Sequence, residues 1–180
     1  MLSILISLDL FVMLLIAILL IVFLIIMINF KRKKYNAFIA NIINNLMKNK
    51  MENIKYDNKN KLYSLSFKYD NKNYYIKVID GGNKKGIVMT NPTTIHFKTY
   101  SSQYGPATKS EYAKKIAPFL SEKLDGIKII LVRKNMLRIT KYINENELEE
   151  VKYNIPSFNT FIVQEKDFNN YLEYIKNKKK

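Results

Sequence analysis

Few residues in this chain could carry out chemistry. His96 is the only histidine and there is no cysteine, so the chain can assemble neither a His/Cys zinc site nor a Cys–His pair. Ser64 and Ser110 have no base that the sequence places beside them. We therefore predict no catalytic site, no metal site and no cofactor. The lack of cysteine is also compatible with a cytoplasmic location.

Two short segments carry several charged residues, and both have an ordinary structural explanation. Residues 80–86 read DGGNKKG, which has the glycines and lysines of a phosphate-binding loop but not the G-x-x-x-x-G-K-[ST] spacing, and this favours a turn between strands. Residues 144–150 read NENELEE and lack the D-x-D-x-D-G pattern of a calcium loop. They fit the capped start of a short acidic helix that ends at Val151.

The clearest local pattern is a β-hairpin. Residues 62–69 alternate apolar and polar side chains, residues 70–73 are typical turn formers, and residues 74–79 form a second strand-like run. Tyrosine and lysine on that second run, at Tyr74, Tyr75 and Lys77, are candidate nucleic-acid contacts, because tyrosine stacks on bases and lysine binds phosphate. Ordinary strand packing explains the same spacing.

Helices and strands alternate along the rest of the chain. Residues 38–47 have apolar side chains at helical spacing, and we call the helix that they predict the stripe helix. It either packs on the domain core or lies on the membrane surface, and its Asn-rich polar face favours the core. This order predicts an α/β domain, a small mixed sheet flanked by helices, with the apolar run 127–133 in the interior of the sheet. The expected elements besides the hairpin and the acidic helix are a stripe helix at 38–47, strands at 87–90 and 94–100, a helix opened by the capping box 108–111 and kinked at Pro118, strands at 127–133, 137–143 and 160–164, and a terminal helix capped by Asp167.

A family resemblance rests on the first helix, the hairpin YSLSFKYDNKNYYIKVI, a second helix and the buried strand IKIILV. Together they resemble the restriction-endonuclease-like fold, in particular the nuclease-related domains that some bacteria attach to a membrane helix. In active members an Asp, a Glu and a Lys of this hairpin hold Mg²⁺ and stabilise charge at the scissile phosphate. Here these positions hold Ser64, Lys77 and Ile79. The resemblance therefore implies a degenerate nuclease fold without catalytic activity.

The segment that is expected to hold the rest of the chain at a membrane is apolar. Leu10 to Phe30 contains no charged residue, proline or glycine, and four basic residues follow at once: Lys31, Arg32, Lys33 and Lys34. A helix of about 20 apolar residues spans a membrane. A cleaved signal peptide would have a basic start, a shorter apolar run and a small-residue cleavage site. None of these is present, so we predict an uncleaved single-pass transmembrane helix, with Asp9 at its start reaching the headgroups.

The distribution of charge predicts the orientation of that helix. All 30 Lys and Arg residues follow Phe30, whereas one of the 15 acidic residues precedes it, so the region after Phe30 has a formal charge of +16. The positive-inside rule then places the N-terminus outside the cell membrane and the domain in the cytoplasm, beside anionic lipid headgroups. Abundant Lys, Asn, Ile and Tyr are typical of an AT-rich bacterial genome, which accounts for part of this charge.

These observations predict three regions and a function class. Residues 1–30 form the transmembrane anchor, 31–34 a basic juxtamembrane segment, and 35–180 a basic cytoplasmic α/β domain. The expected function is that of a non-enzymatic binding or scaffold module with an unknown protein partner. The alternative is a membrane-tethered nucleic-acid-binding protein of degenerate nuclease ancestry. A hydrolase is the third possibility, and it would require residual carboxylates, for example Asp80 and Glu111, to meet in one pocket.

Overall fold

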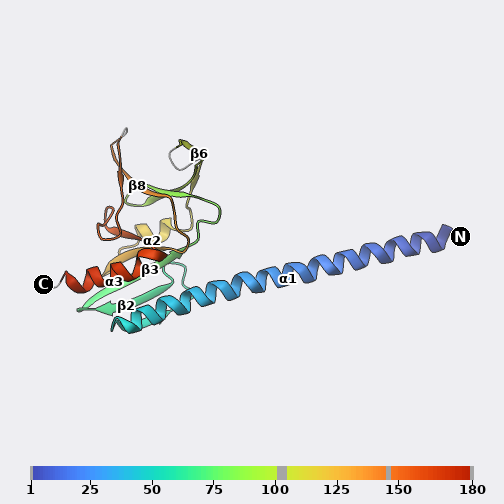
Figure 1. The fold of residues 1–180 in the computed structure, drawn as a ribbon, viewed down its shortest axis with the longest axis horizontal. Coiled ribbons are helices and arrows are strands. Elements are labelled where there is room, and N and C mark those ends of the chain that lie inside the picture. Colours follow the sequence, from blue (N-terminus) through green and yellow to red (C-terminus); the bar gives the residue numbers. More distant parts are fainter. Residues whose placement is uncertain (1, 101–104, 145–146, 179–180) are drawn as a thin grey trace. The chain divides into compact units, whose positions relative to one another are not determined.

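The computed structural model describes residues 2–100, 105–144 and 147–178, with side chains from Phe11 onward (Figure 1). The chain divides into two compact units, Met1–Ile43 and Asn44–Lys180. The first unit consists of helix α1, which spans Leu2–Lys48 and so continues into the second unit. Of the described residues, only this helix is long and apolar enough to cross a membrane, and its most apolar part buries no side chain.

Helix α1 is continuous where we expected two separate elements. The basic residues Lys31 to Lys34 lie inside it rather than in a link between an anchor and a stripe helix. Lys and Arg are good helix formers, and neither Gly nor Pro interrupts the run from Leu2 to Lys48. In the second unit the end of the helix contributes Leu46, which is fully buried, whereas Met47 of the predicted apolar stripe is 60 % exposed.

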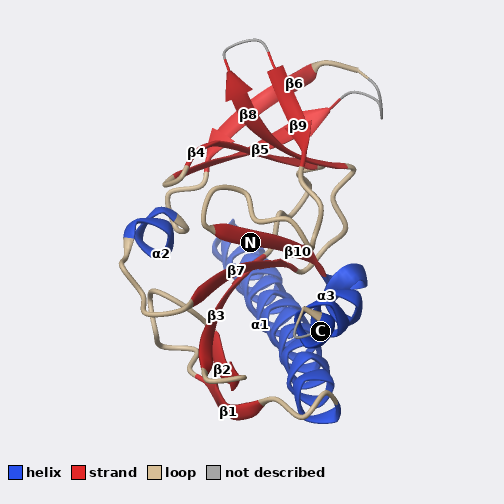
Figure 2. Cartoon of the chain, turned by 90° about the vertical axis from the view of Figure 1, so that its left-hand side faces the viewer, coloured by secondary structure: helices blue, strands red, loops and turns tan. Residues whose placement is uncertain are grey.

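The second unit contains two mixed five-stranded sheets, where we expected one (Figure 2). In sheet A, β1 and β2 and then β2 and β3 pair antiparallel, while β3, β7 and β10 run parallel. The run that was expected in the interior is β7, which has a neighbour on each side. The strand order is β1 (Glu52–Tyr56), β2 (Leu65–Tyr69), β3 (Lys72–Ile79), β7 (Ile127–Val132) and β10 (Thr160–Gln164).

Sheet B has a parallel pair at its centre and antiparallel strands on both sides. Strands β4 and β8 are parallel, β5 and β6 extend the sheet from β4, and β9 extends it from β8. The strand order is β6 (Ala107–Tyr112), β5 (Thr94–Tyr100), β4 (Gly86–Asn91), β8 (Arg138–Asn144) and β9 (Glu147–Glu150).

Two parallel stretches of chain pass together from sheet A into sheet B. Strand β3 leads into β4, and its parallel neighbour β7 leads into β8, the parallel neighbour of β4. Backbone hydrogen bonds hold the two stretches together at the passage: Arg133 N donates to Ile79 O at 2.9 Å, and Leu137 N donates to Lys85 O at 2.7 Å. The segment 80–86 is therefore the strand-connecting turn that the sequence predicts.

The β2–β3 hairpin forms as predicted, with a two-residue turn. Asp70 and Asn71 have φ angles of 51° and 59°, the left-handed values that the favoured hairpin turns require and that Asp and Asn tolerate. Alternation then directs Leu65, Phe67 and Tyr74 into one core. Helix α3 (Phe168–Asn177) follows a short 3₁₀ turn (Glu165–Asp167), and it buries the four residues that the sequence predicts, namely Phe168, Tyr171, Leu172 and Ile175.

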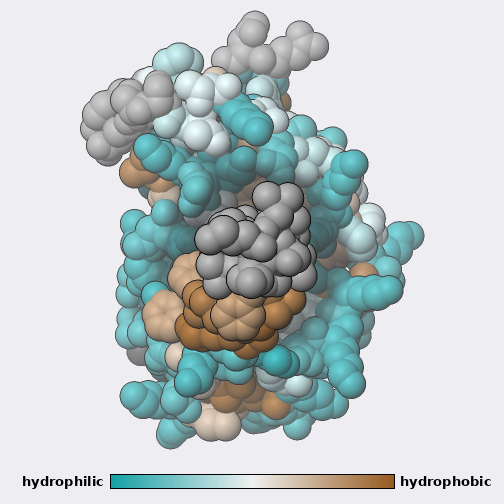
Figure 3. All heavy atoms as spheres, turned by 90° about the vertical axis from the view of Figure 1, so that its right-hand side faces the viewer, coloured by the Kyte–Doolittle hydropathy of each residue, from teal (hydrophilic) through white to brown (hydrophobic). Residues whose placement is uncertain are grey.

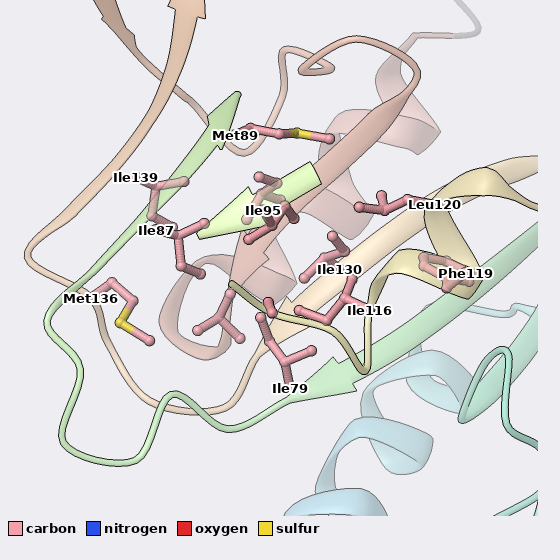
Figure 4. Packing of buried hydrophobic residues seen from close by; sticks show 13 residues of the cluster. Ile79, Ile87, Met89, Ile95, Ile116, Phe119, Leu120, Ile130, Met136 and Ile139 are labelled. Carbon is pink, nitrogen blue, oxygen red and sulfur yellow. The ribbon is translucent and has the colours of Figure 1, made fainter. Parts of the chain in front are cut away.

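The opposite face of sheet A is covered by a second cluster of buried hydrophobic side chains (Figure 4). This cluster joins Ile79 and Ile130 of sheet A to Ile87 and Ile95 of sheet B and to Phe119 of helix α2 (Ala117–Ser121). Sheet A is thus enclosed on both faces. This explains why four consecutive residues of β7, from Ile129 to Val132, are all 0 % exposed.

Two expected elements were wrong, and one strand was missed. Residues 107–112, expected to open a long helix, form strand β6, and the helix is reduced to five residues with Pro118 in its first turn, where proline is tolerated. Residues 147–150, expected to be helical, form strand β9 against β8. Strand β1 was missed because its sequence, ENIKY, shows little apolar alternation. In the two wrong cases, pairing with a neighbouring strand prevails over local helix signals.

Candidate functional site: a basic groove beside the end of strand β3

The second unit contains a groove of about 700 Å³, which we call the junction groove. It is lined by the end of β3 (residues 77–80), by Phe97 of β5, and by residues 111–116, which lead from β6 toward α2. The apolar side chains Ile79 and Ile116 belong to the buried cluster below, so they supply a firm floor, while lysines and carboxylates surround it.

Lys77 is the most constrained cation of the junction groove. Its Nζ donates a hydrogen bond to Lys61 O at 2.6 Å, and partial burial lowers its pKa from the usual lysine value. The three positions that the family resemblance marks as reactive lie together here. Lys77 and Ile79 line the groove, and Ser64 Oγ accepts a hydrogen bond at 3.3 Å from Val78 N, which lies between them in sequence.

The two carboxylates proposed from the sequence, Asp80 and Glu111, both line the junction groove. Asp80 accepts from Arg133 at 3.2 Å, lies 3.8 Å from Lys134 Nζ, and also accepts from Gly82 N at 2.9 Å. Asp80 is thus engaged by two cationic side chains and one backbone N–H.

Glu111 is also held in an ion pair. Lys84 Nζ lies 2.7 Å from its carboxylate, and this hydrogen bond, with the lysine charge, lowers the pKa of Glu111. Over the described residues no cluster of three or more His, Cys, Asp and Glu side chains could hold a metal ion. The two carboxylates therefore lie in one groove, but each of them is already paired with a cationic side chain.

The remaining cations give the junction groove its character. Lys114 and Lys115 are exposed at its edge, and neither they nor Lys77 form an ion pair with a described carboxylate. With Asp80 and Glu111 already paired, these three positive charges are the uncompensated ones among the lining residues. An apolar floor surrounded by uncompensated lysines is suited to a ligand that carries negative charge.

The candidate nucleic-acid contacts are divided between the two faces of sheet A. Tyr74 is 4 % exposed and stacks on Phe67, with ring centroids 4.7 Å apart and an interplanar angle of 5°. Tyr75 and Lys77 project from the other face, where the Tyr75 ring lies 5.0 Å from that of Tyr63. Tyr63 and Tyr75 line a hollow with Lys55 and Lys68. The structure thus brings Tyr75 and Lys77 to one face and leaves Tyr74 in the core.

A Ser–His contact that the sequence did not suggest lies on sheet B. Ser110 Oγ is 3.4 Å from His96 Nδ1, because β5 and β6 place the two residues on neighbouring strands, and the His96 ring lies 5.7 Å from that of Tyr112. No carboxylate of the described residues hydrogen-bonds to the imidazole. The arrangement therefore lacks the third group that orients a catalytic histidine.

The charged segments singled out from the sequence have simple environments. Lys31, Arg32, Lys33 and Lys34 are exposed on helix α1, and Lys34 Nζ lies 4.4 Å from the Phe30 ring centroid. Glu145 lies outside the described residues, and Glu149 forms an ion pair with Lys141 at 2.9 Å. The side chain of Asp9 also lies outside the described residues. These contacts are surface interactions without a binding geometry.

No model of a known protein family, no characterised protein and no solved structure matches the chain significantly.

Proposed function

We propose that the protein is a single-pass membrane protein whose basic domain is a non-enzymatic binding or scaffold module at the inner face of the cell membrane. The observation that carries the proposal is the exposed apolar helix α1, which runs without interruption into the basic residues Lys31 to Lys34. In Figure 3 the side chains seen on this helix are hydrophobic, whereas the visible surface of the domain is largely hydrophilic. An apolar surface of this length is unfavourable in water, so the helix requires lipid around it.

The proposed orientation follows from charge. Every lysine and arginine of the chain lies after Phe30, so the positive-inside rule favours an outside N-terminus and a cytoplasmic domain. Lys31 to Lys34 would then meet the anionic headgroups of the inner leaflet, each contributing about 1 kcal/mol of attraction. A signal sequence would be removed after export, whereas the anchor stays on the chain.

Alkaline extraction of membranes and the intact mass of the purified protein test the anchor. We expect the full chain to remain in the membrane pellet at high pH and to retain its first 30 residues in the mature mass. Release into the supernatant, or a mature chain that begins after the apolar run, would refute it. A variant with Lys31 to Lys34 changed to Gln should still be anchored, because the apolar helix rather than the basic cluster provides the insertion energy.

The non-enzymatic part of the proposal rests on the junction groove. A hydrolase would need Asp80 and Glu111 to hold a metal ion or a water, but Asp80 contacts Arg133 and Lys134, and Glu111 contacts Lys84. Lys77, at a position where the nucleases that the hairpin resembles have a carboxylate, would repel a divalent cation. We expect no cleavage of DNA or RNA by the purified full chain with Mg²⁺ or Mn²⁺. Cleavage that is lost in both Asp80→Asn and Glu111→Gln would establish an enzyme instead.

The partner is expected to be anionic, because the uncompensated charges of the groove are Lys77, Lys114 and Lys115. A Lys114→Gln/Lys115→Gln double variant should weaken binding of an acidic peptide, such as oligoglutamate, more than the matched variant Lys123→Gln/Lys152→Gln, whose lysines are exposed outside the groove. Equal losses in the two variants would mean that binding depends on net charge and not on the groove.

The second candidate function, nucleic-acid binding by a degenerate nuclease fold, has its own support. The elements that carry the resemblance are present in order, as α1, the β2–β3 hairpin, α2 and the buried strand β7. Tyr75 and Lys77 share a face of sheet A with Tyr63, beside a hollow lined by Lys55 and Lys68. A stacking platform beside lysines is typical of proteins that bind single-stranded nucleic acid.

A salt titration separates the two candidates. Attraction of a basic domain to phosphate alone falls steeply between about 50 and 200 mM salt, since bound counterions are released. We expect the full chain in detergent to lose its binding of both DNA and RNA over this range. Retained binding to one nucleic acid at the higher salt, weakened by Tyr75→Ala but not by Tyr153→Ala, would favour the second function over the first.

A further inference from the structure

The last residues of strand β3 have a neighbouring strand on one side only. On one side β3 is paired with β2 as far as the register pair of Leu65 and Ile76, whereas β3 itself continues to Ile79. On the other side β7 stays paired with β3 to its end, where Ile79 lies opposite Val132. This interior strand of sheet A therefore has an open edge along its last residues, beyond the point where β2 begins.

The pairing with β7 shows which backbone groups lie on this open edge. Arg133 N donates to Ile79 O at 2.9 Å, so the backbone of Ile79 is directed toward β7. Neighbouring residues of a strand direct their backbone groups to opposite sides, so those of Val78 and Asp80 are directed toward the open edge. There Ser64 Oγ accepts from Val78 N at 3.3 Å. Among the described residues, Val78 O and Asp80 N have no hydrogen-bond partner.

The junction groove reaches this open edge. Four consecutive residues, 77–80, line it. Successive side chains of a strand point to opposite faces, so a groove confined to one face of β3 would contact only every second side chain. Ile79 belongs to the buried cluster below the groove, which places its side chain and that of Lys77 on the groove face. Contact with Val78 therefore means that the groove extends around the strand edge, where the backbone is accessible.

An open strand edge is a binding surface for an extended peptide, which adds to the sheet as a further strand. Main-chain hydrogen bonds then provide affinity, and the alternate side chains that face the protein provide specificity. At about 3.3 Å per residue, the edge formed by residues 77–80 is long enough for about four peptide residues. The added strand would lie beside β3, in the position that β2 occupies along the first part of this strand.

The charges of the groove favour acidic side chains at alternate positions of such a peptide. Every second side chain of an added strand would point to the groove face, on which the side chain of Lys77 lies. Lys114 and Lys115 line the same groove and are also uncompensated, since the lining acids Asp80 and Glu111 are already paired with cations. Carboxylates at alternate positions would all meet this positive field, whereas carboxylates on adjacent residues would be divided between the two faces.

We propose that the junction groove binds an extended acidic peptide segment of about four residues as an additional strand beside β3, with a carboxylate at every second position. Val78 O accepts a hydrogen bond from a peptide N–H, and Asp80 N donates to a peptide C=O. This inference rests on the proposed function, an anionic protein partner at this groove, and adds the conformation and the spacing that the groove recognises.

The first test compares two labelled octapeptides of equal composition and charge on the full chain in detergent. One alternates Glu and Thr, and the other has four Glu followed by four Thr. An added strand presents four carboxylates of the first peptide to the groove face but only two of the second. We expect the alternating peptide to bind about fivefold more tightly by fluorescence anisotropy, since each cross-strand charge pair contributes. Equal affinities would overturn the inference, because binding would then depend on net charge alone.

The second test uses two isomers of the alternating peptide, one N-methylated at every Glu and the other at every Thr. In an added strand only every second peptide N–H faces β3, so we expect one isomer to lose binding and the other to retain it. Equal affinities of the two isomers would overturn the strand addition.

The lysine variants separate this inference from the proposed function. If Lys114→Gln/Lys115→Gln weakens both octapeptides more than Lys123→Gln/Lys152→Gln does, while the N-methyl isomers bind equally, the anionic partner stands and the strand addition is wrong. If the two double variants bind both octapeptides as the wild type does, the proposed function itself is wrong.

Discussion

The two sheets of the domain differ in how much of their surface is covered. Sheet A is enclosed by α3 on one face and by the hydrophobic cluster on the other, and four of the five residues of its edge strand β10 are buried, although its other edge strand, β1, is largely exposed. In sheet B both edge strands, β6 and β9, are exposed along their whole length. The covered strands of sheet A, which we call the frame, are thus stabilised by buried side chains. The edges of sheet B are held by backbone hydrogen bonds with little burial.

Two concave sites of the domain differ in the same way, in how buried their linings are. A hollow of about 170 Å³ lies between sheet A and helix α3 and includes the aromatic side chains of Tyr74, Phe161 and Tyr171, whereas the junction groove lies where the chain leaves sheet A and its lining includes exposed residues of β6. The first site is thus set against buried side chains of sheet A, and the second is bordered by exposed charged residues. The following variants test whether the frame and the edges differ as the burial indicates.

The largest expected effect is the loss of a buried side chain from sheet A. Ile129→Ala in β7, at 0 % exposure, should lower the free energy of unfolding by about 2–5 kcal/mol. Leu148→Ala in β9, where Leu148 is 51 % exposed, should change it by less than about 0.5 kcal/mol. Chemical denaturation of the full chain in a mild detergent measures both. A comparable loss in the two variants would show that β9 is buried in solution.

How well the sequence predicts each sheet reflects the same difference. The strands of the frame, β2, β3, β7 and β10, are predicted within a few residues, because burial on one or both faces imposes apolar alternation or a continuous apolar run. The exposed strands β6 (ATKSEY) and β9 (ELEE) carry no such pattern, so their capping-type residues suggested helices. Their strand pairing depends on β5 and β8, which local sequence does not reveal.

The site was predictable only in part for the same reason. Lys77 and the carboxylates Asp80 and Glu111 were recognised as residues of interest, and they do line one groove. Their ion pairs with Arg133 and Lys84 connect residues far apart in the chain and could not be foreseen. The unpartnered hydroxyl of Tyr171 was also unforeseeable, because its helical spacing with Phe168, Leu172 and Ile175 indicates only a core position.

Glycine substitutions are expected to have the next largest effect. At Gly126, before β7, a Cβ would lie 2.4 Å from Asn73 O, a backbone atom that cannot move without disturbing β3. Gly126→Ala should therefore cost about 1–3 kcal/mol or more. At Gly82, in the passage to sheet B, the φ of 59° is unfavourable for alanine but no atom lies within 4 Å. Gly82→Ala should cost about 1–2 kcal/mol, and thermal unfolding should rank the two variants in this order.

Removal of an unpartnered hydroxyl offers a smaller and opposite effect. Tyr171 Oη on the sheet A side and Thr140 Oγ1 in sheet B are both buried without a partner among the described residues. Tyr171→Phe and Thr140→Val keep most of the side-chain shape, so each should raise the free energy of unfolding by about 1 kcal/mol. A loss of stability in either variant would mean that water or a ligand satisfies that hydroxyl in solution.

The smallest expected effects are the pH responses of two glutamates, which should have opposite signs. Burial raises the pKa of Glu165, which follows β10, although Arg133 acts against this shift. The fold therefore disfavours ionised Glu165, and Glu165→Gln should be more stable than wild type at neutral pH. This advantage should shrink as the pH falls through the raised pKa. An advantage that grows on acidification would contradict the assignment.

Glu111 on β6 should behave in the reverse way. Its hydrogen bond and ion pair with Lys84 lower its pKa, so its contribution is present above the usual glutamate pKa and is lost as the pH falls through the lowered value. Glu111→Gln should be slightly less stable than wild type at neutral pH, and the two should converge in acid. Because Glu111 is exposed, high salt should also reduce the difference. Paired unfolding curves across the acidic range measure both glutamates.

The most direct test of the proposed anchoring is the topology of the full chain in a bacterial inner membrane. Two reporters, one active only in the cytoplasm and one active only outside it, are fused in turn after Lys180. We expect activity from the cytoplasmic reporter alone, and a weaker preference when Lys31 to Lys34 are changed to neutral residues, because these charges favour the inside orientation. Activity of the external reporter with silence of the cytoplasmic one would contradict the account, since it would place the basic domain outside the cell.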